Sequence, residues 1–353
     1  MPTALVTGAT GMVGSHIVER LHADGWSVRA LVRNAAAHAG GDRGRGEMLA
    51  WLRARGVELA AGDVLDQPAF ARAAQSCDAI FHTAAMIIPL SRALRAYDAY
   101  RIPNVDGTRN AISAAERAGA RLLQLSSVAV YGPESRYDLA AAAERVDEET
   151  PLRPLPERAF YARSKRESEE LVLQAHAAGR IWATAVRPDV IYGPRDRQFV
   201  PRIARLLRYG IGPVVAGGGS TLAIVHAANV ADGAVLAATH PDAGGRAYNL
   251  ANDFDVTVAE FYRLAGEGLG RRVRIVSIPL WLARAGLQVG KRAMKLVTGS
   301  RMSVVSTASL DFVTRDNPFS SDRARRELGW APSVRPEVGV PGAFRWWRES
   351  HMA

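Results

Sequence analysis

Cysteine and lysine are both scarce in this sequence. Cys77 is the only cysteine among 353 residues, which excludes a disulfide framework and a zinc site built on cysteines and is typical of a reducing, cytoplasmic environment. The chain has three lysines, so 42 of its 45 basic residues are arginines. No lysine-rich tract and no basic stripe interleaved with aromatics occurs, so we do not expect nucleic acid as a partner.

Long apolar runs are also missing. No uninterrupted stretch of 18 apolar residues occurs, so we expect no membrane-spanning helix. A strand is expected from Ala4 without a charged leader and apolar run before it, so we expect no targeting signal. With 48% hydrophobic and 23% charged residues, the composition is that of a folded protein that can bury a large core.

The charge balance is basic, with a formal net charge of +10. One interpretation is that arginine is abundant simply because the genome is rich in G and C. The other is attraction to anionic ligands or to an anionic membrane surface.

Short apolar runs alternate with helical stretches through the first half of the chain. This alternation predicts an α/β fold, a doubly wound parallel (Rossmann) sheet of six or seven strands. The expected strands are 4–7, 28–32, 57–60, 79–82, 121–126 and 182–186, and the expected helices are 15–23, 104–118 and 161–178. We expect residues 1–192 to form the Rossmann core. Residues 193–353 would form mostly a smaller substrate-binding and lid region, with some segments returning to the core.

A glycine-rich turn follows the first expected strand. Its glycines recur as Gly-x-x-Gly-x-x-Gly: Gly8 permits a tight turn, Gly11 lets backbone approach a pyrophosphate, and Gly14 allows the helix to pack closely on the strand. The phosphates would then lie at the positive end of the helix. Because this turn joins the first strand to the first helix of a chain whose strands and helices alternate, the pattern predicts a dinucleotide site.

The end of the second strand lacks an acidic residue. A carboxylate there would hold the ribose 2′-hydroxyl of NAD, but the strand ends in Val32 and Arg33. A guanidinium suits a 2′-phosphate, so we expect NADP as the cofactor, with NAD as the alternative. The non-functional interpretation is that Arg33 is an ordinary solvent-exposed arginine at the end of a strand. Asp63 follows the third strand and would either accept from the adenine amino group or cap the next helix.

A tyrosine and a lysine share one face of an expected helix. Lys165 follows Tyr161 by four residues, so its positive charge would favour the phenolate and lower the tyrosine pKa. Such a phenol can donate or accept a proton near neutral pH. Ser126 and Ser127 end a strand about 35 residues earlier, where a serine could hydrogen-bond the same substrate oxygen.

These motifs occur in the order seen in extended short-chain dehydrogenases/reductases, which the chain resembles over nearly its whole length. The matching segments are 7–14, 63–64, 81–85, 104–108, 127–132, 161–165 and 187–194. Residues 193–202 and 224–231 and the tail segments 310–320 and 324–332 resemble the 3β-hydroxysteroid dehydrogenase-like branch of that family.

The resemblance implies a role for each matched residue. Tyr161 would be the catalytic acid/base, Lys165 its pKa-lowering and ribose-binding neighbour, and Ser127, in preference to Ser126, the serine that orients the substrate. Asn104 would organise a proton-relay water or cap its helix. The implied cofactor-binding residues are Thr7, Gly8, Thr10, Gly11, Met12, Val13, Gly14, Arg33, Asp63, Val64, Ala84, Ala85, Asn104, Tyr161, Lys165, Pro188 and Val190. No metal is expected.

The resemblance also implies an activity. It is hydride transfer between a nicotinamide and a hydrophobic alcohol or ketone, either sterol-like or a long-chain 3-keto or 3-hydroxy compound. A sugar-nucleotide epimerase or dehydratase on the same fold is the alternative, and a non-catalytic dinucleotide sensor is less favoured. Family members often dimerise through the helices that correspond to 104–118 and 161–178, so a homodimer is expected.

The segment 278–297 bears on the substrate independently. It is rich in Leu, Trp, Val and Met, and its cations Arg284, Lys291, Arg292 and Lys295 share one helical face. Such a basic amphipathic helix suits a membrane surface or the lid of an apolar pocket. The alternative is an ordinary surface helix packed on the core.

Overall fold

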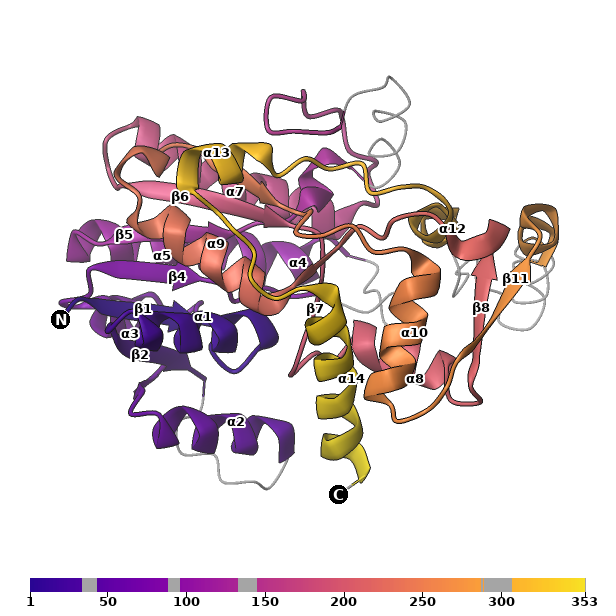
Figure 1. Ribbon diagram of the computed structural model, residues 1–353. Helices are drawn as coiled ribbons and strands as arrows, with labels where there is room; N and C mark the ends of the chain where they lie inside the picture. The colour runs from indigo at the N-terminus through magenta and orange to yellow at the C-terminus, as the bar shows by residue number, and fades with distance from the viewer. Residues whose placement is uncertain (34–42, 88–95, 133–144, 287, 289–306, 353) are drawn as a thin grey trace.

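A seven-stranded parallel sheet forms the centre of the computed structural model, which describes residues 1–33, 43–87, 96–132, 145–286, 288 and 307–352 (Figure 1). The strand order is β10-β6-β5-β4-β1-β2-β3. The strands are β1 (Thr3–Thr7), β2 (Ser27–Val32), β3 (Glu58–Ala61), β4 (Ala79–His82), β5 (Arg121–Leu125), β6 (Ala183–Pro188) and β10 (Ala247–Leu250). The expected doubly wound α/β fold is confirmed.

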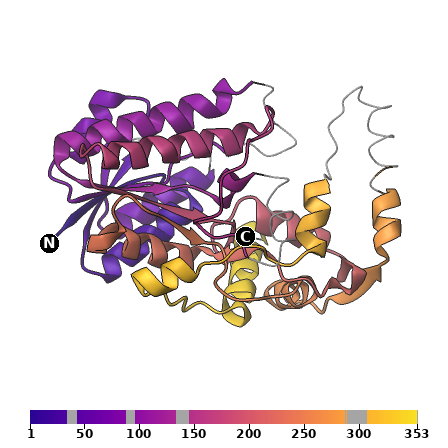
Figure 2. The same ribbon diagram turned by 90° about the horizontal axis from the view of Figure 1, so that it is seen from above.

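Helices cover both faces of this sheet (Figure 2). One face carries α1 (Met12–Ala23), α2 (Arg43–Ala54), α9 (Ala227–Thr239) and α13 (Asp322–Leu328), and the other carries α3 (Gln67–Ala74), α5 (Gly107–Ala118) and α7 (Phe160–Ala177). Strand side chains point alternately to the two faces, so Ala4 and Val6 enter one apolar core and Leu5 the other. Both faces are buried, which is why these strands are almost uniformly apolar.

A third apolar core lies beyond the sheet, around Tyr192, Phe261 and Phe344. The elements of this region include two parallel strand pairs, β7 (Val190–Tyr192) with β9 (Ile224–His226) and β8 (Ile211–Val215) with β11 (Arg274–Ile278). Its helices are α8 (Phe199–Leu206), α10 (Val258–Gly268), α12 (Thr307–Thr314) and α14 (Pro336–Met352). Short helical turns occur at η3 (Val128–Tyr131), η4 (Ala216–Gly218) and η5 (Pro241–Ala243).

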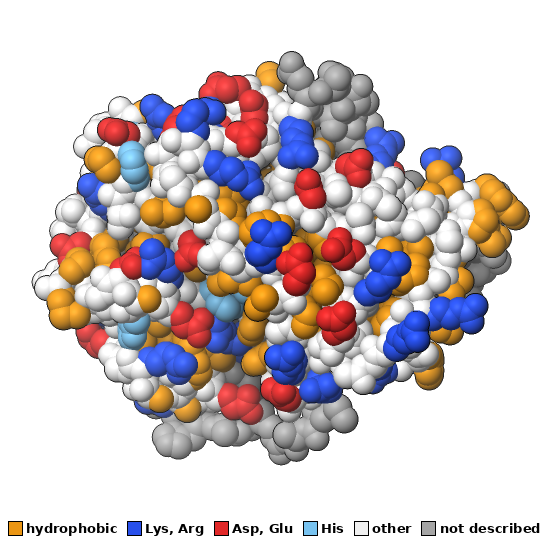
Figure 3. All heavy atoms as spheres, viewed as in Figure 1, with side chains coloured by type: hydrophobic (Ala, Val, Ile, Leu, Met, Phe, Trp, Pro, Cys, Tyr) orange, Lys and Arg blue, Asp and Glu red, His pale blue; other side chains and the backbone are white. Residues whose placement is uncertain are grey.

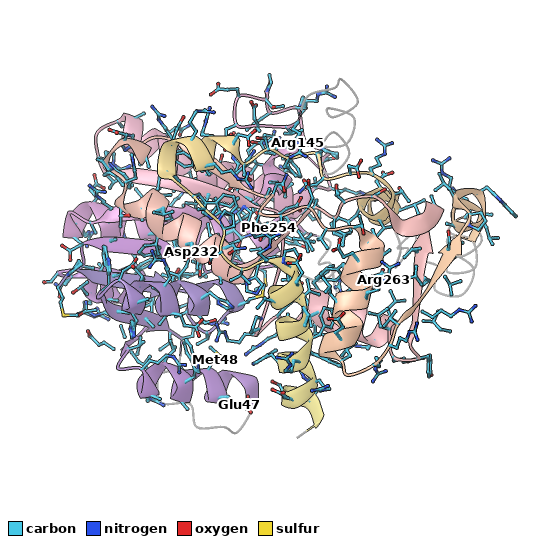
Figure 4. All side chains as sticks on the ribbon, viewed as in Figure 1. Glu47, Met48, Arg145, Asp232, Phe254 and Arg263 are labelled. Carbon is cyan, nitrogen blue, oxygen red and sulfur yellow. The ribbon has the colours of Figure 1, made fainter. Side chains whose placement is uncertain are left out.

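Segments after residue 193 also complete the Rossmann part of the molecule. Strand β10 pairs with β6 at the sheet edge, and α9 packs against α1. Asp232 of α9, labelled in Figure 4, lies 2.9 Å from Nε of Arg20 on α1. The helix that carries the glycine motif is therefore held by a segment more than 200 residues further along the chain.

The expected helix at 104–118 differs in its start. The helical run begins with α4 (Asp98–Arg101), passes through the π-helical turn η2 (Ile102–Asp106) and continues as α5. Pro103 lies in the π turn, and because proline has no N–H to donate, the regular α-helical bonding is interrupted there. Within the described part of the chain, no helix has both the length and the hydrophobicity that crossing a bilayer would require.

Candidate active site

The glycine turn between β1 and α1 forms a cradle of backbone. Gly8 has a φ of +73°, and a Cβ added there would lie 2.7 Å from Thr83 Oγ1. A Cβ on Gly14 would overlap the carbonyl oxygen of Gly8. Gly11 is exposed and precedes α1 without a side-chain cap, so no cap side chain accepts from the N–H groups of the first turn of α1. These features fit a pyrophosphate held at the helix N-terminus.

Thr7 anchors the neighbouring strand end to this turn. Its Oγ1 accepts from the Ala84 N–H at 3.2 Å and lies 2.9 Å from Nδ1 of His82, while Thr83 Oγ1 donates to the Thr7 carbonyl at 2.6 Å. These bonds hold Ala84 beside the glycine turn. Burial lowers the pKa of His82 to about 3, so the ring is neutral. Sequence analysis did not assign His82 to the site.

Arg33 lies at the carboxyl end of β2 and is largely exposed, with 63% of its side chain accessible. Its Nε is 3.9 Å from Oδ2 of Asp63, so the end of β2 has a carboxylate nearby after all, contributed by a loop rather than by the strand. Asp63 accepts from the Leu65 N–H at 2.9 Å, whereas Asp66 is the residue that caps α3. The helix-cap interpretation of Asp63 is therefore wrong, and the adenine contact stays a prediction.

Ser127 and Tyr161 come together at the carboxyl edge of the sheet. Ser127 follows β5 with an extended backbone and caps the turn η3 by accepting from the Ala129 N–H at 3.2 Å. It lies close enough to Tyr161, at the start of α7, to act on the pKa of that phenol. Ser126 is buried, and its Oγ has no hydrogen-bond partner among the described residues. The geometry therefore places Ser127, and not Ser126, against the tyrosine.

Burial dominates the protonation of Tyr161 and Lys165. It raises the pKa of Tyr161 to about 12, although Ser127 acts in the opposite direction. It lowers the pKa of Lys165 to about 8, opposed by the charge of Glu169. The Lys165 ammonium donates to the carbonyl oxygen of Leu125. The sequence-based expectation of a lowered Tyr161 pKa is thus not met here, because desolvation of the phenolate is the largest influence on it.

A buried ion pair lies one helical turn beyond Lys165. Arg187 of β6 donates from Nη2 to Glu169 of α7 at 2.5 Å and from Nη1 to the Tyr131 hydroxyl at 2.7 Å. The two charged side chains are 7% and 3% exposed. Burial acts against the Arg187 charge, but Glu169 and Tyr131 outweigh it and raise the arginine pKa. The pair joins α7, which carries Tyr161 and Lys165, to the central sheet and to the turn that follows Ser127.

Asn104 is buried in the π turn between α4 and α5. Its Oδ1 accepts from the Met86 N–H at 2.6 Å, and its Nδ2 donates to Ser164 Oγ at 2.9 Å. Since it lies inside the helical run and makes no cap bond, the helix-cap interpretation is wrong. Asn104 instead ties the segment after β4 to the helix that carries Tyr161.

The remaining expected cofactor residues border the same edge of the sheet. Pro188 ends β6 and Val190 begins β7, with the Val190 N–H donating to Asp189 Oδ1 at 2.8 Å. Val64 is fixed through its carbonyl, which accepts from Asn110 at 2.9 Å. The other expected residues lie on the glycine turn, at the start of α1 and directly after β4; they are Thr10, Met12, Val13 and Ala85.

Sequence reasoning did not assign Glu169, Arg187 or Ser164 to the site. Glu169 could have been assigned to the site from its spacing. It follows Lys165 by four residues, which places its carboxylate on the helix face that carries the lysine. Its partner on β6 could not be identified from spacing alone.

Comparison with known proteins agrees with this geometry. The model of the NAD dependent epimerase/dehydratase family matches residues 4–251. A 4-hydroxy-2-methyl-3-oxo-4-farnesyl-3,4-dihydroquinoline-1-oxide ketoreductase of Stigmatella aurantiaca is 31% identical over 339 residues, covering 95% of this chain and 93% of that protein. A 2-alkyl-3-oxoalkanoate reductase of Shewanella oneidensis is 28% identical, with coverages of 96% and 84%. A 3β-hydroxysteroid-dehydrogenase/decarboxylase of Arabidopsis thaliana is 27% identical, with coverages of 95% and 60%.

Solved structures share the fold. The UDP-glucuronic acid 4-epimerase of Bacillus cereus in complex with NAD superposes with a TM-score of 0.73 at 17% identity, over 99% of both chains. The dTDP-glucose 4,6-dehydratase of Streptomyces venezuelae with NAD bound superposes with a TM-score of 0.70 at 24% identity, over 99% of this chain and 98% of that one. With a dinucleotide cradle, an adjoining Ser127–Tyr161 pair and a family match across most of its length, the chain belongs to the NAD-dependent epimerase/dehydratase family, as an extended short-chain dehydrogenase/reductase whose relatives include ketoreductases and a 3β-hydroxysteroid dehydrogenase.

Proposed function

We propose that this NAD(P)-dependent oxidoreductase reduces a hydrophobic ketone to an alcohol, or oxidises the alcohol, with NADP as its cofactor. The observation that carries the proposal is that Ser127, directly after β5, and Tyr161, at the start of α7, come together at the carboxyl edge of the sheet, with the buried Lys165 one helical turn after Tyr161. The glycine cradle lies at the same edge, so the reacting groups and the dinucleotide would meet there.

Residues of the chain would bind the cofactor, donate the proton and stabilise the developing charge. When bound, the nicotinamide supplies or accepts the hydride. The pyrophosphate would rest on the glycine turn, and Val190 would face the carboxamide. Tyr161 is protonated at neutral pH because its pKa is about 12, so it is ready to give a proton to a substrate carbonyl oxygen. Ser127 orients that oxygen, and the positive charge of Lys165 stabilises the negative charge that develops on it.

Two observations support a hydrophobic substrate. Met86 and Ile87 follow β4 with 41% and 50% of their surface exposed, and Asn104 holds Met86 next to the catalytic helix. The relatives are named for reactions of a farnesylated quinoline, an alkyl-oxoalkanoate and a steroid. These support an apolar ketone or alcohol over a nucleotide sugar.

The position of Arg33 supports NADP. Its exposed guanidinium lies at the carboxyl end of β2, and a charge-assisted bond from it to a 2′-phosphate would distinguish NADP from NAD. The buried Cys77 supports a cytoplasmic location. Helices α5 and α7 lie side by side on one face in Figure 2 and would carry the homodimer contact, for which light scattering is the test.

Replacement of Tyr161 by Phe tests the activity. We expect Tyr161→Phe to lose at least about 100-fold in turnover of a panel of hydrophobic ketones while NADPH binding stays unchanged. Retained turnover would contradict the assignment. The denatured wild-type protein should release no tightly held dinucleotide, because a reductase exchanges its cofactor; one NAD⁺ per chain would instead favour a sugar-nucleotide epimerase.

A further inference from the structure

The positive charge of this protein is concentrated in one part of the fold. Residues 197–231 and 268–286 contain eight arginines and no Asp or Glu, which leaves 37 basic and 35 acidic residues in the rest of the chain. These two segments meet where β8 pairs with β11, in the register Ile211 with Arg274 and Pro213 with Val276. We call the surface formed by residues 208–211, β11 and residues 279–286 the basic lobe.

One side of this strand pair is buried and the other is not. Val214 and Ile275 pack against α10 in the third apolar core, whereas apolar side chains on the other side face outward. Of the strand residues, Ile211 is 49% and Val276 40% exposed. Tyr209, just before β8, is 76% exposed, and Trp281 and Leu282, after β11, are 70% and 47% exposed. An aromatic and aliphatic surface of this kind usually meets another apolar phase.

Arginines surround these apolar side chains. Arg208, Arg271, Arg272, Arg274 and Arg284 are all exposed, and none of them pairs with a carboxylate within the described part of the chain. Along the chain, the nearest acidic residues are Asp196 for Arg208 and Glu267, near the end of α10, for the arginines at β11. In the view of Figure 3, blue and orange side chains share the end of the molecule that holds β8 and β11, and among the coloured side chains no red ones appear at that end.

We infer that the basic lobe docks on an anionic lipid bilayer. Arginine guanidinium groups would pair with lipid phosphates, while Trp281 and Leu282 would enter the interface between headgroups and acyl chains, where tryptophan is favoured. Exposed aliphatic side chains have no counterpart on a nucleic-acid backbone, which favours a bilayer over RNA. A symmetric dimer through this surface would bring unpaired arginines of two copies together, which disfavours a second copy of the chain.

The basic lobe takes most of its positive charge from residues other than those expected for segment 278–297. Lys291, Arg292 and Lys295 lie outside the described residues, so the basic lobe includes only Arg284 of those four cations. The remaining charge comes from the segments before β8 and at β11, which the sequence pattern alone did not bring together.

Vesicle sedimentation tests the inference without any substrate, so its outcome is separate from that of the proposed function. We expect the full chain to sediment with vesicles of phosphatidylcholine and phosphatidylglycerol in equal parts, and not with phosphatidylcholine alone, with binding reduced by added salt. The triple variant Arg272→Ser/Arg274→Ser/Arg284→Ser and the double variant Trp281→Ser/Leu282→Ser should each lose at least about tenfold in vesicle affinity.

The matched control variants remove three arginines, or two apolar side chains, at exposed positions outside the basic lobe. Arg117→Ser/Arg153→Ser/Arg158→Ser and Leu152→Ser/Val338→Ser alter exposed side chains outside the basic lobe and should bind vesicles as the wild type does. Circular dichroism of each variant confirms that it is folded. The inference is overturned by absence of binding to the anionic vesicles at low salt, or by equal losses in the control variants. It is also overturned if an RNA oligonucleotide binds through these arginines while Trp281→Ser/Leu282→Ser leaves vesicle binding intact.

Discussion

Glu169 and Arg187 form a bidentate ion pair that is almost completely enclosed, with Nε of Arg187 3.1 and 3.0 Å from the two carboxylate oxygens. The pair lies between α7 and β6, the strand that leads to Val190. Since Arg187 also donates to Tyr131, the same guanidinium supports the turn that begins at Ser127. All three proposed catalytic residues therefore lie on elements that this one buried contact joins: Tyr161 and Lys165 on α7, and Ser127 at the start of the turn.

Removal of the Glu169 charge should destabilise the fold strongly. In Glu169→Gln the buried guanidinium loses its counter-charge, and we expect the free energy of unfolding to fall by about 3 kcal/mol or more. Urea denaturation measures the change. The neighbouring Glu170 is exposed, so Glu170→Gln should change stability by less than about 0.5 kcal/mol. Equal losses in the two variants would contradict the importance of the pair.

Lys165 should make stability depend on pH in a defined window. Its pKa is about 8 in the folded chain and 10.5 for an unperturbed lysine, so between these values the unfolded chain holds a proton that the folded chain has lost. The unfolding free energy of the wild type, relative to Lys165→Met, should therefore rise with pH by up to about 1.4 kcal/mol per pH unit. It should be constant below pH 8.

Urea denaturation of both proteins at pH 7 and pH 9.5 provides the measurement. Tyr161, with a pKa of about 12, is present in both proteins, so its titration does not affect the difference between them. A stability difference that is the same at the two pH values would show that Lys165 is not desolvated in the folded chain.

Gly14 should tolerate no side chain. An added Cβ would overlap the Gly8 carbonyl oxygen and would lie 2.9 Å from the Ala9 Cα, so the helix and the turn must separate. We expect Gly14→Ala to lower stability by about 1–3 kcal/mol and to abolish dinucleotide binding. Gly342 of α14 has open space around its Cβ position, so Gly342→Ala should be neutral or stabilising by up to about 1 kcal/mol. Thermal denaturation with and without NADPH distinguishes the two, and retained binding in Gly14→Ala would refute the pyrophosphate cradle.

Arg33 should decide between the two dinucleotides. We expect Arg33→Ala to weaken NADPH binding by about 10- to 100-fold, as for a lost bond between charged groups, while NADH binding is unchanged. Fluorescence titration with each cofactor measures both affinities. Arg55→Ala, at an exposed position directly after α2, is the control with the same loss of charge. Parallel losses for NADPH and NADH would mean that Arg33 does not contact the 2′-phosphate.

Local patterns in the sequence were sufficient for six of the seven strands of the central sheet, but not for β10 at its edge. The alternation of apolar runs predicted strands at 4–7 and 79–82, and these lie within β1 and at β4. The spacing of Tyr161 and Lys165 placed both on one helix, which α7 confirms. Such features depend on neighbours a few residues apart, whose geometry is set by the period of a strand or a helix.

Contacts between distant segments were decided by the tertiary structure alone. The pairing of Arg33 with Asp63, of Glu169 with Arg187, and of Ser127 with Tyr161 joins elements whose proximity depends on the order of strands in the sheet. The same holds for the pKa of Tyr161, because desolvation depends on which segments cover a side chain. The sequence by itself therefore determined the fold class and the glycine turn, and it predicted the catalytic residue types. Only the packed structure decided which serine meets the tyrosine, where charge is buried, and where the unpaired arginines gather.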